Sequence, residues 1–269
     1  MSIPATSSSL DVRGARLGFT DFGAENLPLA ISAHGLTSSR ASTLRSGVGD
    51  YTAVGQGGHR RLVSYDARGH GESSGGRSAE EYHWSKLALD LLAVADHFSP
   101  EAPVAGIGLS MGTGTLLHAV THLPGRFDRL VLSAPPTAWQ TRAGQAGMYN
   151  QMADVIEKGT PDELVELFAS VPLPEIFADL PEFGAVPDID ISLLPTVFRG
   201  AGQSDLPPFE ALSGITQPTL ILAWAGDPGH PVSTAEKLAE LIPNSELVVS
   251  TTSSDVQTWG ARAAAFLAS

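Results

Sequence analysis

The chain has 269 residues, long enough for one large α/β domain with an insertion, and its hydrophobic content of 42% fits a globular protein with a substantial core. Its formal net charge of -13 repels phosphate backbones and anionic membranes, and no Lys/Arg cluster offsets this charge, so neither nucleic acid nor a membrane is an expected partner. The absence of cysteine excludes disulfides, thiolate nucleophiles and Cys-ligated metals.

The location of the protein is expected to be cytoplasmic. Residues 1–9 have neither a basic start nor an apolar stretch, so no export signal is indicated. No window of the chain is apolar enough over the length of a membrane span.

Short apolar or alternating runs predict a series of strands, and segments with apolar residues at helical spacing lie between them. The expected strands are residues 15–22, 28–33, 61–65, 103–109, 127–134, 218–224 and 246–250. The expected helices around them are residues 79–97, 111–120 and 255–268. Strands that alternate with helices predict an α/β fold with a mostly parallel sheet covered by helices on both faces.

Residues 137–213 interrupt this alternation, because they contain helical patterns and Pro-rich joints without a clear strand. Helices are expected at 145–158, 161–170 and 191–200. We interpret the segment as a helical cap inserted in a core formed by residues 1–136 and 214–269. The segment is also acidic, which is typical of a solvated surface and disfavours a strongly anionic substrate.

The most informative motif is Gly-x-Ser-x-Gly around Ser110, which lies between a predicted strand and a predicted helix. A serine at the apex of so sharp a turn requires neighbours without side chains, which Gly108 and Gly112 provide. Its hydroxyl is then exposed beside the N-terminus of the helix, where backbone N–H groups can stabilise an oxyanion. The alternative is an ordinary Gly-rich turn between a strand and a helix.

Four motifs follow successive strands in one order. They are His34-Gly35, Asp66-x-Arg68-Gly69-x-Gly71-x-Ser73, Gly108-x-Ser110-x-Gly112 and Gly226-Asp227-Pro228. In order and spacing the chain resembles the α/β-hydrolase superfamily, and within it the capped esterases and lactonases, over nearly its whole length. This resemblance implies an eight-stranded sheet, a cap, no cofactor, and serine-dependent hydrolysis of an ester or a similar bond.

The resemblance also assigns roles to individual residues. Ser110 would be the nucleophile, and the backbone N–H groups of Leu36 and Met111 would form the oxyanion hole. Asp227 stands where the family places the carboxylate that orients a catalytic histidine, although Asp-Pro also begins turns readily. His34 could reach the substrate or could be a structural residue of its turn.

The pattern of the family breaks after the last predicted strand, where a catalytic histidine is expected and the sequence reads Val249-Ser-Thr-Thr-Ser-Ser-Asp-Val256. One explanation is that the base has moved to His230, three residues after Asp227 in the loop Gly226-Asp-Pro-Gly-His-Pro-Val232. A second is that the chain is an inactivated variant, with Ser253 or Ser254 in place of the histidine. A third is an inactive protein that binds a small apolar ligand, and a base supplied by the cap or the substrate is a further alternative.

The expected substrate is a small or medium neutral ester or lactone, bound by a monomer or homodimer. We expect His34, Trp139, Met148 and Met152 to line the substrate pocket, because the last three lie nearest the hinge of the cap and Met provides an adaptable apolar wall. No cluster of His, Asp and Glu has the spacing of metal ligands, so neither a metal nor another cofactor is expected.

Overall fold

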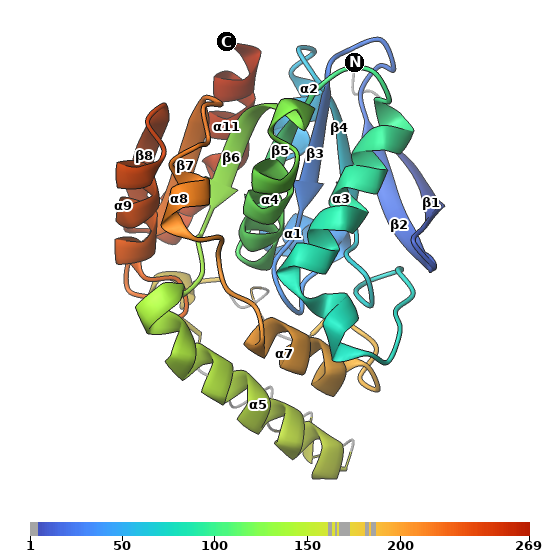
Figure 1. Ribbon diagram of the computed structural model, residues 1–269, viewed down its shortest axis with the longest axis vertical. Coiled ribbons are helices and arrows are strands. Elements are labelled where there is room, and N and C mark those ends of the chain that lie inside the picture. The colour runs from blue at the N-terminus through green and yellow to red at the C-terminus, as the bar shows by residue number, and fades with distance from the viewer. Residues whose placement is uncertain (1–4, 161–162, 165, 167–172, 181–182, 184–186) are drawn as a thin grey trace.

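The computed structural model describes residues 5–160, 163–164, 166, 173–180, 183 and 187–269. An eight-stranded sheet in the order β1-β2-β4-β3-β5-β6-β7-β8 forms the centre of the molecule (Figure 1). The strands are β1 (Thr6–Val12), β2 (Ala15–Phe22), β3 (Leu29–Ala33), β4 (Arg61–Tyr65), β5 (Val104–Leu109), β6 (Phe127–Ser133), β7 (Thr219–Trp224) and β8 (Ser245–Ser250). Only the β1–β2 and β2–β4 pairs are antiparallel, so the predicted mostly parallel, eight-stranded sheet is confirmed.

Both faces of the sheet are buried, which explains the continuous apolar runs of its central strands. In β6, Leu130 and Leu132 belong to one hydrophobic core and Val131 belongs to the other. The helices α3 (Trp84–Phe98), α4 (Met111–His122) and α9 (Val232–Leu241) supply residues to the first core. The helices α2 (Thr52–Gln56) and α11 (Trp259–Ala268) supply residues to the second, on the opposite face (Figure 1).

Some elements differ from the sequence prediction. Strand β1 was not predicted, because its serine-rich and largely exposed residues carry no hydrophobic signal and it is defined by pairing with β2. The single helix predicted at 79–97 is interrupted by extended backbone at His83, which separates the 3-10 turn η1 (Ala79–Tyr82) from α3. The final predicted helix is likewise two elements, α10 (Ser253–Val256) and α11.

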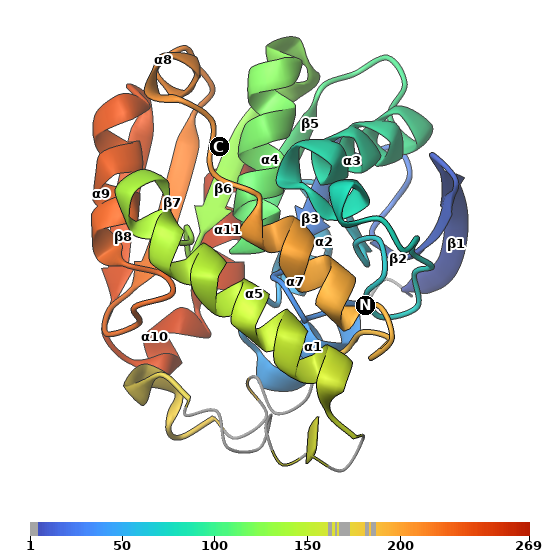
Figure 2. The same ribbon diagram turned by 60° about the horizontal axis from the view of Figure 1, so that its bottom comes forward.

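The segment between β6 and β7 passes below the carboxyl ends of the strands (Figures 1 and 2). Its described elements are η3 (Trp139–Thr141), α5 (Arg142–Lys158), η4 (Glu175–Phe177), α7 (Leu194–Gly202) and α8 (Phe209–Leu212). Helices α5 and α7 pack side by side across this edge (Figure 2). The helix predicted at 161–170 lies outside the described residues except for 163, 164 and 166.

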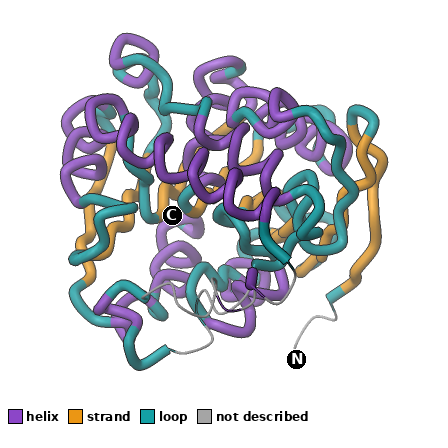
Figure 3. The backbone as a smooth tube through the Cα atoms, turned by 90° about the horizontal axis from the view of Figure 1, so that it is seen from below, coloured by secondary structure: helices purple, strands orange, loops and turns teal. Residues whose placement is uncertain are grey.

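Part of this segment, just before α7, is hydrogen-bonded to the loops at the carboxyl edge. The Asp188 N–H donates to the Thr37 carbonyl at 2.8 Å, and the Gly71 N–H donates to the Asp188 carbonyl at 2.8 Å. Ile189 forms an isolated β-bridge with His70. Viewed from below, the helices after β6 therefore lie in front of the strand ends (Figure 3).

Among the residues that the structure describes, no helix is both long enough and apolar enough to cross a bilayer. In the longest of the described helices, α5, the buried residues are Arg142, Ala153 and Ile156.

Candidate active site

Ser110 lies at a strained turn between β5 and α4. Its backbone has φ +53° and ψ −109°, outside the regions that non-glycine residues favour. A Cβ at Gly108 would lie 2.5 Å from the Gly112 carbonyl oxygen, and one at Gly112 would lie 2.0 Å from the Ala33 carbonyl oxygen. The two glycines are therefore required by the close approach of β3, β5 and α4 at this turn.

The structure brings Ser110, His230 and Asp227 together in one chain of hydrogen bonds. The distance between Ser110 Oγ and His230 Nε2 is 2.7 Å, and that between His230 Nδ1 and Asp227 Oδ2 is also 2.7 Å. His230 and Asp227 both belong to the loop after β7, which runs along the same edge of the sheet as Ser110. This is the geometry of a nucleophile, a base and an orienting acid.

The electrostatics of Asp227 favour the charged carboxylate. Burial raises its pKa, but the hydrogen bond from His230 and the charge of that ring lower it, and donors from Trp224 and Gly229 lower it further, to about 2. The Gly229 N–H donates to Oδ1 at 2.8 Å, and the indole N–H of Trp224 donates to Oδ2 at 3.0 Å. An ionised Asp227 accepts a hydrogen bond from the Nδ1–H of the neutral ring, which leaves Nε2 unprotonated and able to accept the hydroxyl proton of Ser110.

The place where the family carries its histidine, after β8, has a different environment. Ser253 is buried and donates to Asp179 Oδ2 at 2.7 Å, while Ser254 is exposed and lies 3.1 Å from the Thr252 hydroxyl. Both serines are thus hydrogen-bonded to groups outside the Ser110–His230–Asp227 chain.

The loop after β3 approaches the turn at Ser110. A Cβ on Gly35 would lie 3.5 Å from Ser110 Cβ, so the N–H of the next residue, Leu36, is close to the serine. Among the described residues, no acceptor is hydrogen-bonded to the N–H of Leu36 or to that of Met111. Backbone donors beside a serine have the chemistry that stabilises an oxyanion, and the assignment of this role to Leu36 and Met111 stays a prediction.

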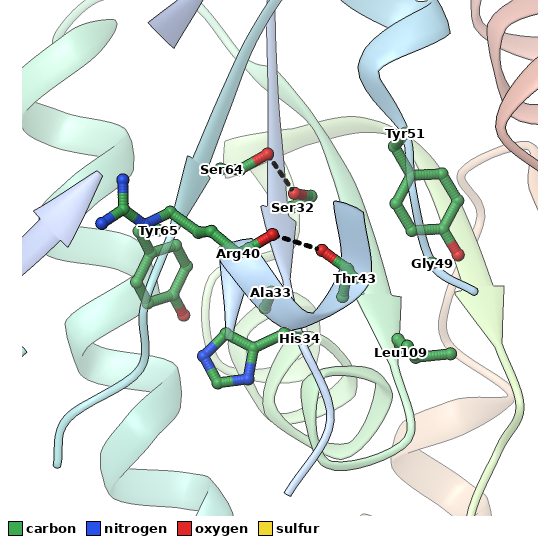
Figure 4. Close-up of a pocket in the computed structure, with 10 residues that line it drawn as sticks. All are labelled: Ser32, Ala33, His34, Arg40, Thr43, Gly49, Tyr51, Ser64, Tyr65 and Leu109. Carbon is green, nitrogen blue, oxygen red and sulfur yellow. Dashed lines mark hydrogen bonds between the residues drawn. The ribbon is translucent and has the colours of Figure 1, made fainter. Parts of the chain in front are cut away.

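His34 holds this loop and does not line the pocket at Ser110, contrary to expectation. Its Nδ1 donates to the Gly35 carbonyl at 2.8 Å, and its Nε2 accepts the N–H of Ala67 at 2.9 Å. Burial lowers the pKa of His34, which favours the neutral ring that these two bonds require. The side chain instead borders a small cavity of about 10 Å³ between β3, β4 and the start of α1 (Arg40–Ser46) (Figure 4).

A much larger cavity of about 510 Å³ opens over Ser110 and His230. Its apolar part is formed by Leu36, Val48, Leu109, Met152, Phe183, Pro187, Phe198 and Trp224. Its polar part is formed by Thr37, Ser38, Ser42, Arg45, Ser46, Gln145 and Tyr149. A mixed lining of this size suits a small organic molecule with a few polar groups.

Two further residues expected in the pocket lie elsewhere. The ring of Trp139 packs edge-on against Phe209, with centroids 4.7 Å apart, and its indole N–H donates to the Pro207 carbonyl. Met148 is 47% exposed on α5 and is not among the residues that line the cavity. Met152, one turn later, does line the cavity.

The sequence analysis did not identify Trp224 or the polar residues between Thr37 and Ser46, which lie in the turn after β3 and in α1. A signal for Trp224 was available, since an indole at the carboxyl end of the strand directly before Asp227 must lie near that carboxylate. The sequence between Thr37 and Ser46 contains no comparable pattern. No group of three His, Asp or Glu side chains within the described ranges could hold a metal ion.

The sheet order, the turn at Ser110 and the insertion after β6 define an α/β-hydrolase fold. The fold is therefore the one that the sequence resemblance implied, and the chain is similar in sequence and structure to hydrolases that have it. The family described as Serine aminopeptidase, S33 matches residues 57–173.

Individual proteins are similar to the chain in sequence or in structure. The chain is 26% identical over 195 residues to 3-oxoadipate enol-lactonase 2 of Acinetobacter baylyi, a match covering 70% of this chain and 69% of the relative. A hydrolase from Pseudomonas aeruginosa has a TM-score of 0.80 at 24% identity, with 98% of each chain covered. The enol-lactonase from Burkholderia xenovorans has a TM-score of 0.68 at 20% identity, with 97% of this chain and 100% of that chain covered.

Proposed function

We propose that this protein cleaves a small neutral carboxylic ester or lactone through an acyl-enzyme on Ser110. The observation that carries the proposal is the unbroken series of hydrogen bonds from Ser110 through His230 to Asp227, at the floor of a cavity. The likeness to 3-oxoadipate enol-lactonase 2 supports a lactone or a related ester.

Acylation begins when Ser110 Oγ attacks the carbonyl carbon and His230 Nε2 takes the hydroxyl proton. The carbonyl oxygen becomes an oxyanion that accepts hydrogen bonds from the N–H groups of Leu36 and Met111. Asp227 stabilises the imidazolium. The intermediate collapses when the bond between the carbonyl carbon and the alcohol oxygen breaks, and His230 gives its proton to that oxygen.

Deacylation repeats the same steps with water as the nucleophile. His230 Nε2 takes a proton from the water as its oxygen attacks the acyl carbon. The second oxyanion occupies the same site beside Leu36 and Met111. Breakage of the ester bond to Ser110 returns the proton from His230 to Oγ and releases the acid. The atoms and protons of the two half-reactions balance with water as the second reactant, so the mechanism requires no cofactor.

The permanent charge in the described lining of the cavity has a carboxylate beside it, which leaves the cavity able to take a neutral substrate. Among the described lining residues, Arg45 is the one that carries a permanent charge. It is 3.8 Å from Asp188 and donates to the Ser42 hydroxyl at 3.0 Å. We further propose that residues 137–213 act as a cap over this cavity, because Gln145, Tyr149 and Met152 of α5 line it.

The test is labelling and turnover with matched serine variants. A fluorophosphonate probe is expected to label Ser110, and the enzyme is expected to hydrolyse p-nitrophenyl acetate. Ser110→Ala should abolish both, whereas Ser254→Ala, a change at an exposed serine after β8, should abolish neither. Absence of labelling at every pH, or turnover that survives Ser110→Ala, would refute the proposal.

The alternative is an inactive protein that binds a small apolar ligand in the same cavity. It predicts thermal stabilisation by ester or lactone analogues without turnover, and the stabilisation would be unchanged in Ser110→Ala.

If the protein is active, comparison of the turnover of δ-valerolactone with that of ethyl acetate separates lactone from linear-ester specificity. A cytoplasmic location and a monomeric or homodimeric state remain predictions from the sequence.

A further inference from the structure

Trp224 connects the end of β7 to the acid and the base. Its indole N–H donates to Asp227 Oδ2 at 3.0 Å, the same oxygen that accepts His230 Nδ1 at 2.7 Å. Its ring also packs edge-on against the imidazole of His230, with centroids 5.0 Å apart and planes at 70°. One side chain therefore contacts both members of the pair.

The indole of Trp224 is itself fixed by an aromatic cluster behind it. Trp224 stacks on Trp259 with centroids 5.4 Å apart and planes at 12°, and Phe177 packs edge-on against it at 4.9 Å. The Trp259 indole N–H donates to the Ser250 hydroxyl at 2.9 Å. Trp224 is 2% exposed, so this packing leaves its indole N–H one direction in which to point.

We propose that Trp224 is a positioning residue that allows an acid and a base three residues apart to work as a pair, an inference that rests on the proposed function. In so short a loop, the Asp227 carboxylate must turn back toward His230 while both oxygens stay hydrogen-bonded. The Gly229 N–H fixes Oδ1 and the indole N–H fixes Oδ2, which defines the plane of the carboxylate. The imidazole, packed against the indole, then directs Nε2 to Ser110.

The indole N–H also offsets part of the charge on Asp227. The titratable groups that face this carboxylate are His230 in its own loop and Tyr149 on α5. Without the indole N–H, more of the negative charge acts on the imidazole, which then retains a proton to higher pH and is a less available base.

The experiment compares Trp224→Phe with Trp259→Phe, because both variants keep an aromatic ring and each removes one indole N–H. Trp224→Phe is expected to lower kcat for p-nitrophenyl acetate about tenfold, the effect of one lost hydrogen bond to a charged group, with a small change in KM. The acid side of its pH profile should move to higher pH. Trp259→Phe keeps the stacked ring and removes a donor that points to Ser250, so kcat should fall much less than in Trp224→Phe and the pH profile should stay in place.

A second measurement does not depend on turnover. The low-field proton signal of the His230 Nδ1–H, identified by its loss in His230→Ala, should shift in Trp224→Phe and stay in place in Trp259→Phe. If the two Trp variants give the same kcat, pH profile and proton signal, the positioning role is refuted. If the wild-type protein is inactive but the signal still shifts in Trp224→Phe alone, the proposed function fails and the positioning role stands.

Discussion

The ends of β7 and β8 are neighbours in the sheet, yet they differ in chemistry. Trp224, the last residue of β7, pairs in register with Ser250, the last residue of β8. The loop after β7 carries both Asp227 and His230, whereas the residues after β8 form the short helix α10 (Ser253–Val256), whose first serine is hydrogen-bonded to Asp179. The resemblance to the family led us to expect the acid at one strand end and the histidine at the other.

This difference shows that, for a histidine to contact both a serine and a carboxylate, the strand that it follows matters less than where its ring atoms lie. A base needs one nitrogen near the serine and the other near a carboxylate. The turn from Asp227 to His230 achieves this with a backbone hydrogen bond of 3.1 Å between their main chains, and Gly229 is tied to Thr137 by another of 3.0 Å. The loop thus has the rigidity that a catalytic residue requires.

The largest effect is expected from removing the base. His230→Ala should lower kcat by about 10,000-fold or more, because a serine hydroxyl without a base is a poor nucleophile at neutral pH. Steady-state hydrolysis of p-nitrophenyl acetate measures this, with a thermal melt to verify folding. His59→Ala, at an exposed histidine, is the matched control. An unchanged kcat in His230→Ala would show that the loop after β7 does not supply the base.

The acid should come next in magnitude. Asp227→Asn keeps the size of the side chain but favours the wrong tautomer of His230, so kcat should fall by about 1,000- to 10,000-fold. Asp11→Asn, on exposed β1, should have no effect. Equal activities of these two variants would assign Asp227 to the turn alone.

A smaller effect concerns stability against acid. The pKa of Asp227 is lowered to about 2 in the folded protein, below its ordinary value of 3.8. The charged carboxylate therefore stabilises the fold above about pH 4, and this contribution, about 1 kcal/mol after allowance for solvent screening, is lost as the pH falls toward 2. Urea unfolding at pH 7 and pH 3 should show the difference between wild type and Asp227→Asn shrinking at pH 3. A difference that grows would have the wrong sign.

The smallest effect tests the other strand end. Ser254→His in the His230→Ala background should give no measurable recovery of kcat, because Ser254 is exposed and its hydroxyl lies 3.1 Å from that of Thr252, outside the Ser110–Asp227 site. The His230→Ala single variant is the reference. Substantial recovery would support the hypothesis that the chain is an inactivated variant with a serine in place of its histidine.

The sequence predicted the central elements because their signals are local. β5 reads as a buried run that ends in glycines around Ser110. The folded chain requires the same glycines, because a Cβ at either position would lie 2.0–2.5 Å from a backbone oxygen. The edge strand β1 escaped prediction because pairing with β2 defines it, whereas its own residues are polar and exposed. The break at His83 was missed for a similar reason, since apolar spacing continues on both sides of it.

The pocket was harder to predict than the site. Met148 and Met152 are both in α5, and only the way in which the helix packs decides that Met152 faces the cavity while Met148 faces solvent. His34 stood next to a predicted oxyanion donor, but its ring is used by the backbone at Gly35 and Ala67. Which side chains share a cavity depends on packing between distant segments, which periodicity does not encode.

By itself, the sequence determined the α/β-hydrolase fold, the position of Ser110 at its turn, and the absence of a histidine after the last strand, because each depends on residues adjacent in the chain. Only the tertiary structure decided that His230 reaches Ser110 at 2.7 Å and that Trp224 and Gly229 hold its acid. The physical reason is that hydrogen bonds of this kind depend on the direction in which a loop folds over the sheet. Contacts with the end of β8, with Thr137 and with the aromatic cluster at Trp224 set that direction.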